Sequence, residues 1–522
     1  MNHAVIPAPA QFDPTGEGEF IFRPGTVVSY ADPRLGALAE RFCAQLTRRT
    51  GIGVHAVGGG ATASPFVLID LGTVADLDGF PEPAGLSPSG GDPADERYAL
   101  RTGADGIVLR APGPAGVARG LTTLIQLAAA GDGRVPGARI LDGPRYAWRG
   151  LSLDVVRASF TVAELRRVID LLELYKLNVL HLHLTDDQAW RIPWGRPSAE
   201  PYSEGDLRSL VDYAAGRFVT IVPEIDTPGH ATALLRLHPE LDSGRNEVDY
   251  EFLAGHPRHA VWLDPDLPAT FGLLEEVLAG VAATFPGPYL HIGADEPRGM
   301  PDDLYVAYVR RLRGLVRALG LRPLGWQESA RAGLSADDVI QFWLTRFDLP
   351  PRLAPHRRAQ MEAELAAAEH DVAAAVAASV PVIVSPLPFC YLDVPYAEPP
   401  ADAVLADAVL ADTGQQDRHG RLGLRGYGAR TVAETFGWDP AAALGPGRSG
   451  QVAGVEAAIW AETITGFGDL GFLLLPRLAG VADKAWSAPG GWAAHRDRLA
   501  RHGRLWAQDG LEYFRSSLVD WV

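Results

Sequence analysis

Asp295 and Glu296 are two adjacent carboxylates that follow the apolar run YLHIGA at 289–294 and precede a proline. A carboxylic acid that stays protonated near neutral pH can donate a proton to a leaving oxygen, while a neighbouring carboxylate handles another part of the substrate. Side chains of adjacent strand residues point to opposite faces, but both can reach one pocket where the chain leaves a sheet. Because an isolated Asp-Glu pair is usually part of a solvated loop, the surrounding elements must decide what this pair does.

Short apolar runs recur along the chain after residue 147, and each is followed by polar or aromatic residues. The runs are 150–155, 177–184, 218–226, 289–296, 322–326, 339–343, 380–385 and 455–460. Segments with helical periodicity, such as 161–175 and 302–320, lie between them. Eight alternations of strand and helix predict an α/β fold of the (β/α)8 TIM-barrel type. RPLGW at 322–326 is a weak strand by itself, so its assignment depends on the regularity of the others.

The carboxyl ends of barrel strands meet at one mouth, where active sites of such barrels are built. The first four runs lead to Asp154 and Arg157; to His183, Asp186, Asp187 and Trp190; to Glu224, Asp226 and His230; and to Asp295 and Glu296. The last four lead to Trp326 and Glu328; to Trp343; to Tyr391 and Asp393; and to Trp460 and Glu462. Aromatic faces cover the C–H face of a pyranose, and charged side chains bind its hydroxyls. A single tryptophan is more often a core residue, but this combination predicts a carbohydrate pocket.

The chain divides into three predicted parts. They are an N-terminal α/β domain at 1–143, the barrel at 144–490 and a closing amphipathic helix at 491–522. Within the first part, 97–111 has the pattern of a β-hairpin whose turn, Gly103–Gly106, supplies positive-φ residues. Residues 345–380 end in an Ala/Glu-rich stretch with high helix propensity, which predicts an extended helical connection within the barrel.

Composition excludes several classes of partner. The net charge of −17 provides no basic surface for a nucleic acid or an anionic membrane. Cys43 and Cys390 are far apart in sequence, which favours two isolated buried thiols over a disulfide or a cysteine metal site. The sequence shows no signal peptide and no run long enough to span a membrane. We therefore expect a cytoplasmic protein, unless a leader precedes this sequence.

Eight stretches between Arg149 and Ser487 together match one pattern: RGLSLDVVR (149–157), YKLNVLHLHLTDDQAWRI (175–192), VPEIDTPGHA (222–231), HIGADEP (291–297), GWQE (325–328), YLD (391–393), IWAE (459–462) and PRLAGVADKAWS (476–487). Through these stretches the sequence resembles glycoside hydrolase family 20, the β-N-acetylhexosaminidases. Residues 98–127 also resemble the small α/β domain that precedes the barrel in this family. Ala294 stands where the family commonly has a second glycine, a difference that we expect to be tolerated.

The resemblance implies substrate-assisted catalysis, in which the N-acetyl carbonyl oxygen of the substrate is the nucleophile and an oxazolinium intermediate forms. Glu296 would be the general acid/base, Asp295 would hold the acetamido group, and Tyr391 would donate a hydrogen bond to its carbonyl oxygen. The implied sugar-binding residues are Arg157 at the C3 and C4 hydroxyls, Glu462 at C4, Asp393 near C6, and Trp326, Trp343 and Trp460 around the sugar. Asp186 and His230 would position the catalytic carboxylates from behind.

These roles predict a terminal N-acetylhexosamine as the substrate, on an oligosaccharide or a small molecule, and no cofactor or metal. Burial and the charge of Asp295 should raise the pKa of Glu296. Three alternatives remain open. His181 and His183 with nearby aspartates could bind a metal, a catalytically decayed relative could bind sugar without cleaving it, and a relative could be specific for a disaccharide or a sulfated sugar.

Overall fold

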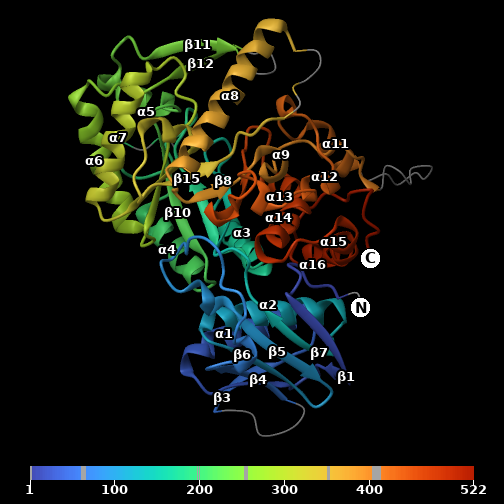
Figure 1. Ribbon diagram of the computed structural model, residues 1–522. Coiled ribbons are helices and arrows are strands. Elements are labelled where there is room, and N and C mark those ends of the chain that lie inside the picture. The colour runs from blue at the N-terminus through green and yellow to red at the C-terminus, as the bar shows by residue number, and fades with distance from the viewer. Residues whose placement is uncertain are drawn as a thin grey trace.

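The computed structural model describes residues 3–59, 66–196, 198, 200–251, 257–347, 349, 353–401 and 413–522. An N-terminal sheet domain lies against the base of a barrel, with the long helix α8 projecting from the opposite end (Figure 1). None of the helices in the described part of the chain is long and apolar enough to cross a membrane.

The N-terminal domain is a seven-stranded sheet covered by two helices, with strand order β1-β7-β5-β6-β4-β2-β3. Its elements are β1 (Gln11–Ile21), β2 (Val27–Tyr30), α1 (Gly36–Thr50), β3 (His55–Gly58), β4 (Phe66–Leu71), β5 (Tyr98–Gly103), β6 (Gly106–Ala111), α2 (Pro114–Ala130) and β7 (Arg134–Asp142). The predicted hairpin is confirmed, because β5 and β6 pair antiparallel. The prediction of positive φ angles in its turn is wrong, because none of the four described residues Gly103–Gly106 has a positive φ.

The second part is a closed barrel of eight parallel strands, which confirms the predicted (β/α)8 fold. The strands are β8 (Trp148–Asp154), β9 (Val179–His183), β10 (Thr220–Thr227), β13 (Tyr289–Gly293), β14 (Arg322–Trp326), β15 (Val339–Phe342), β16 (Val382–Val384) and β17 (Val452–Ile459). All eight coincide with the apolar runs, including the weak one at 322–326. Strands of a parallel barrel are covered on both faces, and this is why they are continuous apolar runs in the sequence.

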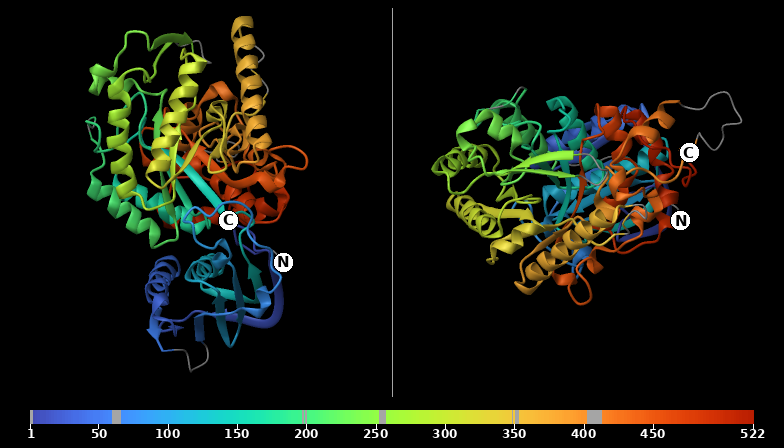
Figure 2. Two further views of the ribbon diagram at one scale, coloured as in Figure 1. Left: turned by 60° about the vertical axis from the view of Figure 1, so that its left-hand side comes forward. Right: turned by 90° about the horizontal axis from the view of Figure 1, so that it is seen from above.

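Helices surround this barrel and cap its ends (Figure 2). They are α3 (Val162–Leu174), α4 (Glu204–Ala215), α5 (Thr232–Leu237), α6 (Pro268–Thr284), α7 (Asp302–Ala318), α8 (Pro355–Ala377), α9 (Leu387–Cys390), α11 (Thr413–Arg421), α12 (Val432–Phe436), α13 (Phe467–Leu474), α14 (Arg477–Trp486), α15 (Trp492–Leu499) and α16 (His502–Gln508). A two-stranded sheet, β11 (Glu247–Glu251) and β12 (Pro257–Val261), follows β10. The connection from β14 to β15 is only a 3-10 helix, Gln327–Ala332.

Two predictions about the helices have different outcomes. The extended helical connection within 345–380 is confirmed as the 23-residue helix α8. The prediction of a single closing helix within 491–522 is wrong. The segment forms two short helices, α15 and α16, which are separated by Ala500 and Arg501. Cys43 and Cys390 are free and buried, as predicted.

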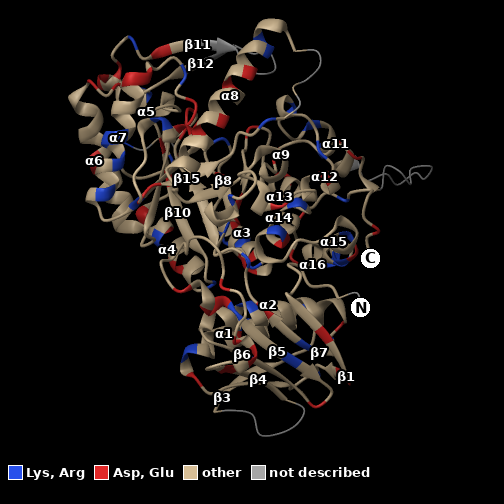
Figure 3. Ribbon diagram, in the orientation of Figure 1, with Lys and Arg blue, Asp and Glu red and all other residues tan. Residues whose placement is uncertain are grey.

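Acidic and basic residues are spread over both domains (Figure 3), and buried pairs of opposite charge join the two. The Glu96 carboxylate contacts the guanidinium groups of Arg119 in α2 and Arg149 in β8, at 2.7 and 2.5 Å. Lys176, just after α3, donates a hydrogen bond of 2.8 Å to Asp142 at the end of β7. Each of these charges has an oppositely charged partner, which is the condition under which buried charges are tolerated.

The backbone turns sharply where β13 ends and the Asp295–Glu296 pair begins. Gly293, Ala294 and Glu296 have φ angles of 65°, 71° and 41°, in the left-handed region. A Cβ atom on Gly293 would lie 1.7 Å from Oδ1 of Asp226, so this position accepts only glycine. Ala294 adopts the unfavourable conformation with its methyl group buried, and the Tyr305 hydroxyl of α7 donates a 2.6 Å hydrogen bond to its carbonyl oxygen.

The Gly293→Ala variant should therefore lose about 2–4 kcal/mol of unfolding free energy, from backbone strain together with the clash against Asp226. Gly320→Ala is the matched control, because Gly320 has a φ of 77° with nothing within 4 Å of the added Cβ. That variant should lose only about 1 kcal/mol from backbone strain. Urea unfolding measures both, and equal losses would contradict the clash.

Candidate active site

A cavity at the mouth of the barrel collects most of the side chains predicted for the site. Its lining includes Arg157, Asp186, His230, Asp295, Glu296, Trp343, Tyr391, Trp460 and Glu462. Two predicted residues, Trp326 and Asp393, are fully buried beside the cavity and are not part of this lining. The barrel therefore brings together residues that are more than 300 positions apart in the sequence.

Asp295 lines this cavity, and one of its oxygens is unsatisfied. Its side chain is largely buried, and in the described part of the chain its Oδ1 atom has no hydrogen-bond partner. Its Oδ2 atom lies 3.7 Å from Nε2 of His230. Burial raises the pKa of Asp295 to about 6, although His230 partly opposes the shift. The carboxylate is thus an acceptor without a donor, in a place where a charge is costly.

Glu296 is held by an arginine that follows it by two residues. The Arg298 guanidinium lies 2.9 Å from Oε1 of Glu296 and 3.1 Å from Oε1 of Glu364 in α8. Burial alone would raise the pKa of Glu296, but the charges of Arg298 and His230 outweigh burial, and the pKa is lowered. The predicted raised pKa is therefore wrong, because the positive charge of Arg298, which the prediction left out, outweighs burial.

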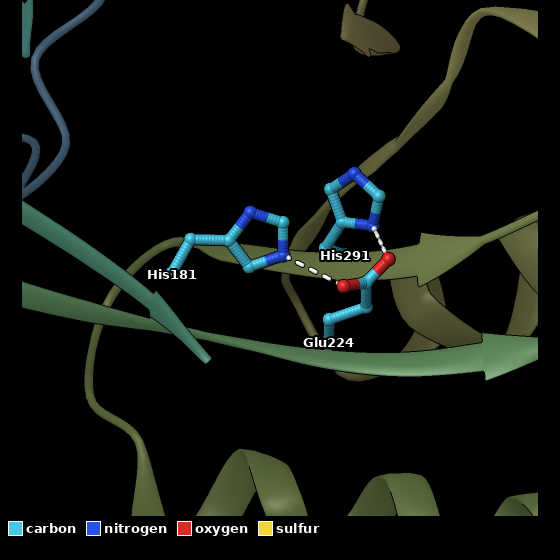
Figure 4. Close-up of side chains that lie close together, drawn as sticks. All are labelled: His181, Glu224 and His291. Carbon is cyan, nitrogen blue, oxygen red and sulfur yellow. Dashed lines mark ion pairs between the residues drawn. The ribbon is translucent and has the colours of Figure 1, made fainter. Parts of the chain in front are cut away.

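Carboxylates and imidazoles alternate behind the site, starting deep in the barrel. Oε1 of Glu456 in β17 lies 2.8 Å from Nδ1 of His181 in β9. Nε2 of the same imidazole lies 3.2 Å from Oε2 of Glu224 in β10. His291 of β13 approaches Glu224 from the other side, with its Nδ1 3.0 Å from Oε1 (Figure 4). Glu224 is fully buried, and imidazoles meet both of its oxygens.

The series continues from Glu224 to the cavity. Oε2 of Glu224 lies 2.7 Å from Nδ1 of His183, whose Nε2 lies 2.8 Å from Oδ2 of Asp186. Oδ1 of Asp186 then lies 3.0 Å from Nδ1 of His230, which faces Asp295. We call this series the carboxylate–imidazole chain: Glu456, His181, Glu224, His183, Asp186, His230 and Asp295.

Opposite charges along this chain stabilise one another. Burial lowers the pKa of each imidazole, but the neighbouring carboxylates outweigh burial and raise the pKa of His181 to about 9. In the same way, Asp186, Asp226 and Asp295 raise the pKa of His230 well above its usual value. The raised pKa favours the imidazolium form of His230, whose Nε2 lies 3.7 Å from Asp295.

Arg157 is fixed in one wall of the cavity. Its guanidinium lies 2.5 Å from Oδ2 of Asp186 and 3.2 Å from Oδ2 of Asp154. It also lies over the ring of Trp460, 5.4 Å from the centroid. Glu462 is exposed at the rim. A guanidinium held by two carboxylates keeps its remaining donors in a fixed direction, which suits the binding of sugar hydroxyls.

The three predicted tryptophans lie at different depths. Trp343 and Trp460 line the cavity, whereas Trp326 is 1% exposed and donates a 2.7 Å hydrogen bond to Oε1 of Glu224. The rings of Trp326 and Trp460 are 6.0 Å apart, so Trp326 supports the aromatic wall from behind. The Trp343 indole donates a 3.2 Å hydrogen bond to Glu328, whose pKa is raised to about 8 by burial and by the charge of Asp295.

Tyr391 and Asp393 come from the segment after β16. Tyr391 stacks on Trp343, with ring centroids 5.8 Å apart. Asp393 is fully buried, and neither carboxylate oxygen has a hydrogen-bond partner among the described residues. Burial, followed by the nearby charge of Glu462, raises the pKa of Asp393 well above its usual value. It is a second buried acceptor without a donor.

Comparison with known proteins identifies the family. A model described as "Glycosyl hydrolase family 20, catalytic domain" matches residues 146–301 and 298–489. A second model, of domain 2 of the same family, matches residues 2–143. The chain belongs to glycosyl hydrolase family 20.

Similar proteins agree with this family 20 assignment over the full length of the chain. A β-N-acetylhexosaminidase of Cellulomonas fimi is 34% identical, covering 99% of this chain and 97% of its own. The solved GH20 β-N-acetylhexosaminidase of Streptomyces coelicolor A3(2) is 30% identical, with a TM-score of 0.80 and 99% of both chains covered. A mutant β-hexosaminidase of Streptomyces plicatus, solved in complex with its product GlcNAc, is 30% identical with the same TM-score, over 99% of this chain and 98% of that one. This chain is a glycoside hydrolase of the β-N-acetylhexosaminidase family.

Sequence reasoning missed two residues of this family 20 site. Arg298 contacts Glu296, and its position two residues downstream was the available signal. Tyr427 lines the cavity from the long segment between β16 and β17, where no apolar run pointed to it. Trp190 follows β9 but is a core residue, whose indole donates to the carbonyl oxygen of Trp194 at 2.7 Å.

The structure also shows where a metal could be held. His181, Glu224 and His291 place three donor atoms within 4.8 Å of one another. His181 and His183 both face Glu224, but they contact different neighbours at their other nitrogens, Glu456 and Asp186. These contacts already balance the charge of Glu224, so the carboxylate–imidazole chain does not require an ion.

Replacing Arg298 with Gln should raise the pKa of Glu296, since burial would no longer be opposed by the guanidinium. A general acid acts while protonated, so a raised pKa keeps it in the active form to higher pH. We expect the profile of kcat/KM against pH to move to higher pH in Arg298→Gln.

Glu364→Gln is the control for this experiment. It removes the other carboxylate of Arg298 and leaves the guanidinium on Glu296. Its profile should stay in place or move to lower pH. A profile for Arg298→Gln that is unchanged, or that moves to lower pH, would refute the role given to Arg298.

Proposed function

We propose that this family 20 enzyme is a retaining exo-β-N-acetylhexosaminidase that removes terminal β-linked GlcNAc or GalNAc by substrate-assisted catalysis. Glu296 would donate its proton to the glycosidic oxygen as the bond from that oxygen to C1 breaks. The acetamido carbonyl oxygen of the same sugar would bond to C1 from the opposite face, forming an oxazolinium ion. Water would then attack C1 as the bond from C1 to the acetamido oxygen breaks, and it would give a proton to Glu296. This second displacement restores both the enzyme and the acetamido group and retains the configuration at C1.

The unsatisfied Oδ1 of Asp295 is the observation that carries the proposal. An acetamido N–H would supply the donor that this buried oxygen lacks. When the carbonyl oxygen attacks C1, positive charge develops on the acetamido nitrogen, and an adjacent carboxylate stabilises that charge. His230, charged by the carboxylate–imidazole chain, helps to keep Asp295 ionised for this purpose.

Substrate binding would shift the pKa of each carboxylate in the direction that catalysis needs. In the empty pocket the pKa of Asp295 is raised to about 6, which brings its titration close to neutral pH, and the pKa of Glu296 is lowered. Catalysis needs Asp295 ionised and Glu296 protonated. The acetamido N–H would lower the pKa of Asp295, and displacement of Arg298 by the leaving group would raise the pKa of Glu296.

The walls of the cavity favour a terminal sugar. Arg157 is positioned to bind ring hydroxyls, Glu462 offers a carboxylate at the rim, and Asp393 lies buried beside the cavity. The cytoplasmic location and the absence of nucleic-acid and membrane partners stay predictions from the sequence.

Replacing Asp295 with Asn should lower kcat on an aryl β-N-acetylglucosaminide by about 100-fold or more, because the developing charge loses its carboxylate. The same substitution should have little further effect on an aryl β-glucoside, which lacks the internal nucleophile and should be a very poor substrate. Release of the aryl chromophore measures both rates.

Asp303→Asn is the matched control, since Asp303 is an exposed acid in the first turn of α7. It should retain the wild-type rate on the N-acetylated substrate. Near-normal turnover by Asp295→Asn, or efficient cleavage of the glucoside by the wild-type enzyme, would reject the substrate-assisted mechanism.

A further inference from the structure

A second cavity adjoins the first and is walled by α8. It measures about 390 Å³ and shares Glu296, Trp343 and Tyr427 with the lining of the catalytic cavity. Helix α8 projects beyond the mouth of the barrel (Figure 2), and its first turns contribute Arg357, Gln360 and Met361 to the lining of this cavity. Because Glu296 lies on the border between the two cavities, a substrate cleaved there would place its leaving group in the second one.

One face of α8 supplies this wall. The helix residues in the lining are Arg357, Gln360, Met361, Ala363, Glu364, Ala367 and Ala368. Most of them are spaced by three or four positions, so they form a stripe along one side of the helix. The lining also includes Met300 and Leu344. A groove with apolar walls and a few polar groups suits a sugar ring.

Two of the three arginines in this lining are already paired. Arg298 contacts Glu296 and Glu364. Arg331 forms a two-pronged pair with Asp371, with distances of 2.8 to 3.0 Å. Glu328, the remaining buried acid in the lining, has a pKa of about 8, so it is mainly neutral at pH 7 and would not repel an anion.

Arg357 differs from the other two. It is 8% exposed, and its Nη1 donates a 2.7 Å hydrogen bond to Gln360. Its Nε has no hydrogen-bond partner, and no ion pair joins it to a carboxylate in the part of the chain that the structure describes. A buried guanidinium without a counterion favours an anionic ligand that can neutralise it.

We propose that this cavity is a leaving-group subsite for an acidic sugar, in which Arg357 binds a carboxylate on the residue that is released. The proposal rests on the proposed function, since it assigns the leaving group of that reaction. Arg357 lies two helical turns from Glu364, about 10 Å along α8. It is therefore placed to contact a substituent of the leaving sugar, away from the bond that Glu296 cleaves.

The same geometry would allow a bound leaving group to displace the Arg298 guanidinium from Glu296. A sugar that enters the second cavity must approach Glu296, where the Arg298 guanidinium now lies. Glu364 can retain Arg298 when that contact is broken. Occupation of the subsite thus frees Glu296 for protonation, and a carboxylate held by Arg357 secures that occupation.

The test compares three disaccharides with GlcNAc β-1,4-linked to different reducing residues. One is neutral N-acetylglucosamine, one is a uronic acid, and one is N-acetylglucosamine that carries a 3-O-lactyl carboxylate. The wild-type enzyme should cleave at least one acidic substrate with a kcat/KM about tenfold above the neutral one, the advantage of one well-placed charge pair. The acidic disaccharide that is cleaved with this advantage shows whether Arg357 binds the carboxylate of a uronic acid or that of a 3-O-lactyl group.

The ratio of acidic to neutral kcat/KM should fall to about one in Arg357→Gln and remain partly in Arg357→Lys, which keeps the charge. Arg358→Gln is the matched control: it removes the same charge from the next residue of α8, which does not line the cavity, and it should keep the wild-type ratio. A wild-type ratio near one, or an unchanged ratio in Arg357→Gln, would overturn the proposal.

The aryl N-acetylglucosaminide separates this outcome from failure of the proposed function. A wild-type enzyme that cleaves it but shows no preference for acidic disaccharides would contradict only the subsite. A wild-type enzyme that cannot cleave it would contradict the proposed function itself.

Discussion

Buried charges in the barrel interior are stable only while each one has a partner of opposite sign. The carboxylate–imidazole chain meets this condition from Glu456 at depth to Asp295 at the mouth, with each link at hydrogen-bond or ion-pair distance. Removing any member would leave its neighbours uncompensated. The rigidity of the site and the charge on His230 therefore have the same origin.

At the mouth of the barrel, Arg298 and α8 affect the pKa of the Glu296 carboxyl group. In the empty pocket burial raises the pKa of Asp295, while Arg298 outweighs burial at Glu296 and lowers its pKa. Both shifts oppose the protonation states that catalysis needs, and we propose that the substrate reverses them. Its acetamido group would hydrogen-bond to Asp295, and its leaving group would displace Arg298. The long helix α8 thus affects the acid Glu296, because Arg298 contacts both Glu364 of α8 and Glu296.

The fold could be predicted because parallel barrel strands are buried on both faces and appear as apolar runs at regular intervals. Residues at the ends of those runs were predictable for the same reason, and most of them line one cavity. What could not be predicted depends on side-chain direction. Arg298 acts on Glu296 only because the chain turns at Ala294 and Glu296, and Trp326 turns inward to Glu224. Tyr427 arrives from a segment with no periodic pattern.

In the proposed mechanism the substrate brings its own nucleophile to Asp295. Aryl glucosaminides whose N-acetyl group carries none, one, two or three fluorine atoms test this step, because fluorine withdraws electrons from the carbonyl oxygen and leaves the binding groups of the sugar in place. Attack by that oxygen predicts that kcat/KM falls steeply with each added fluorine. A rate that is independent of fluorine substitution would show that the acetamido oxygen does not attack C1.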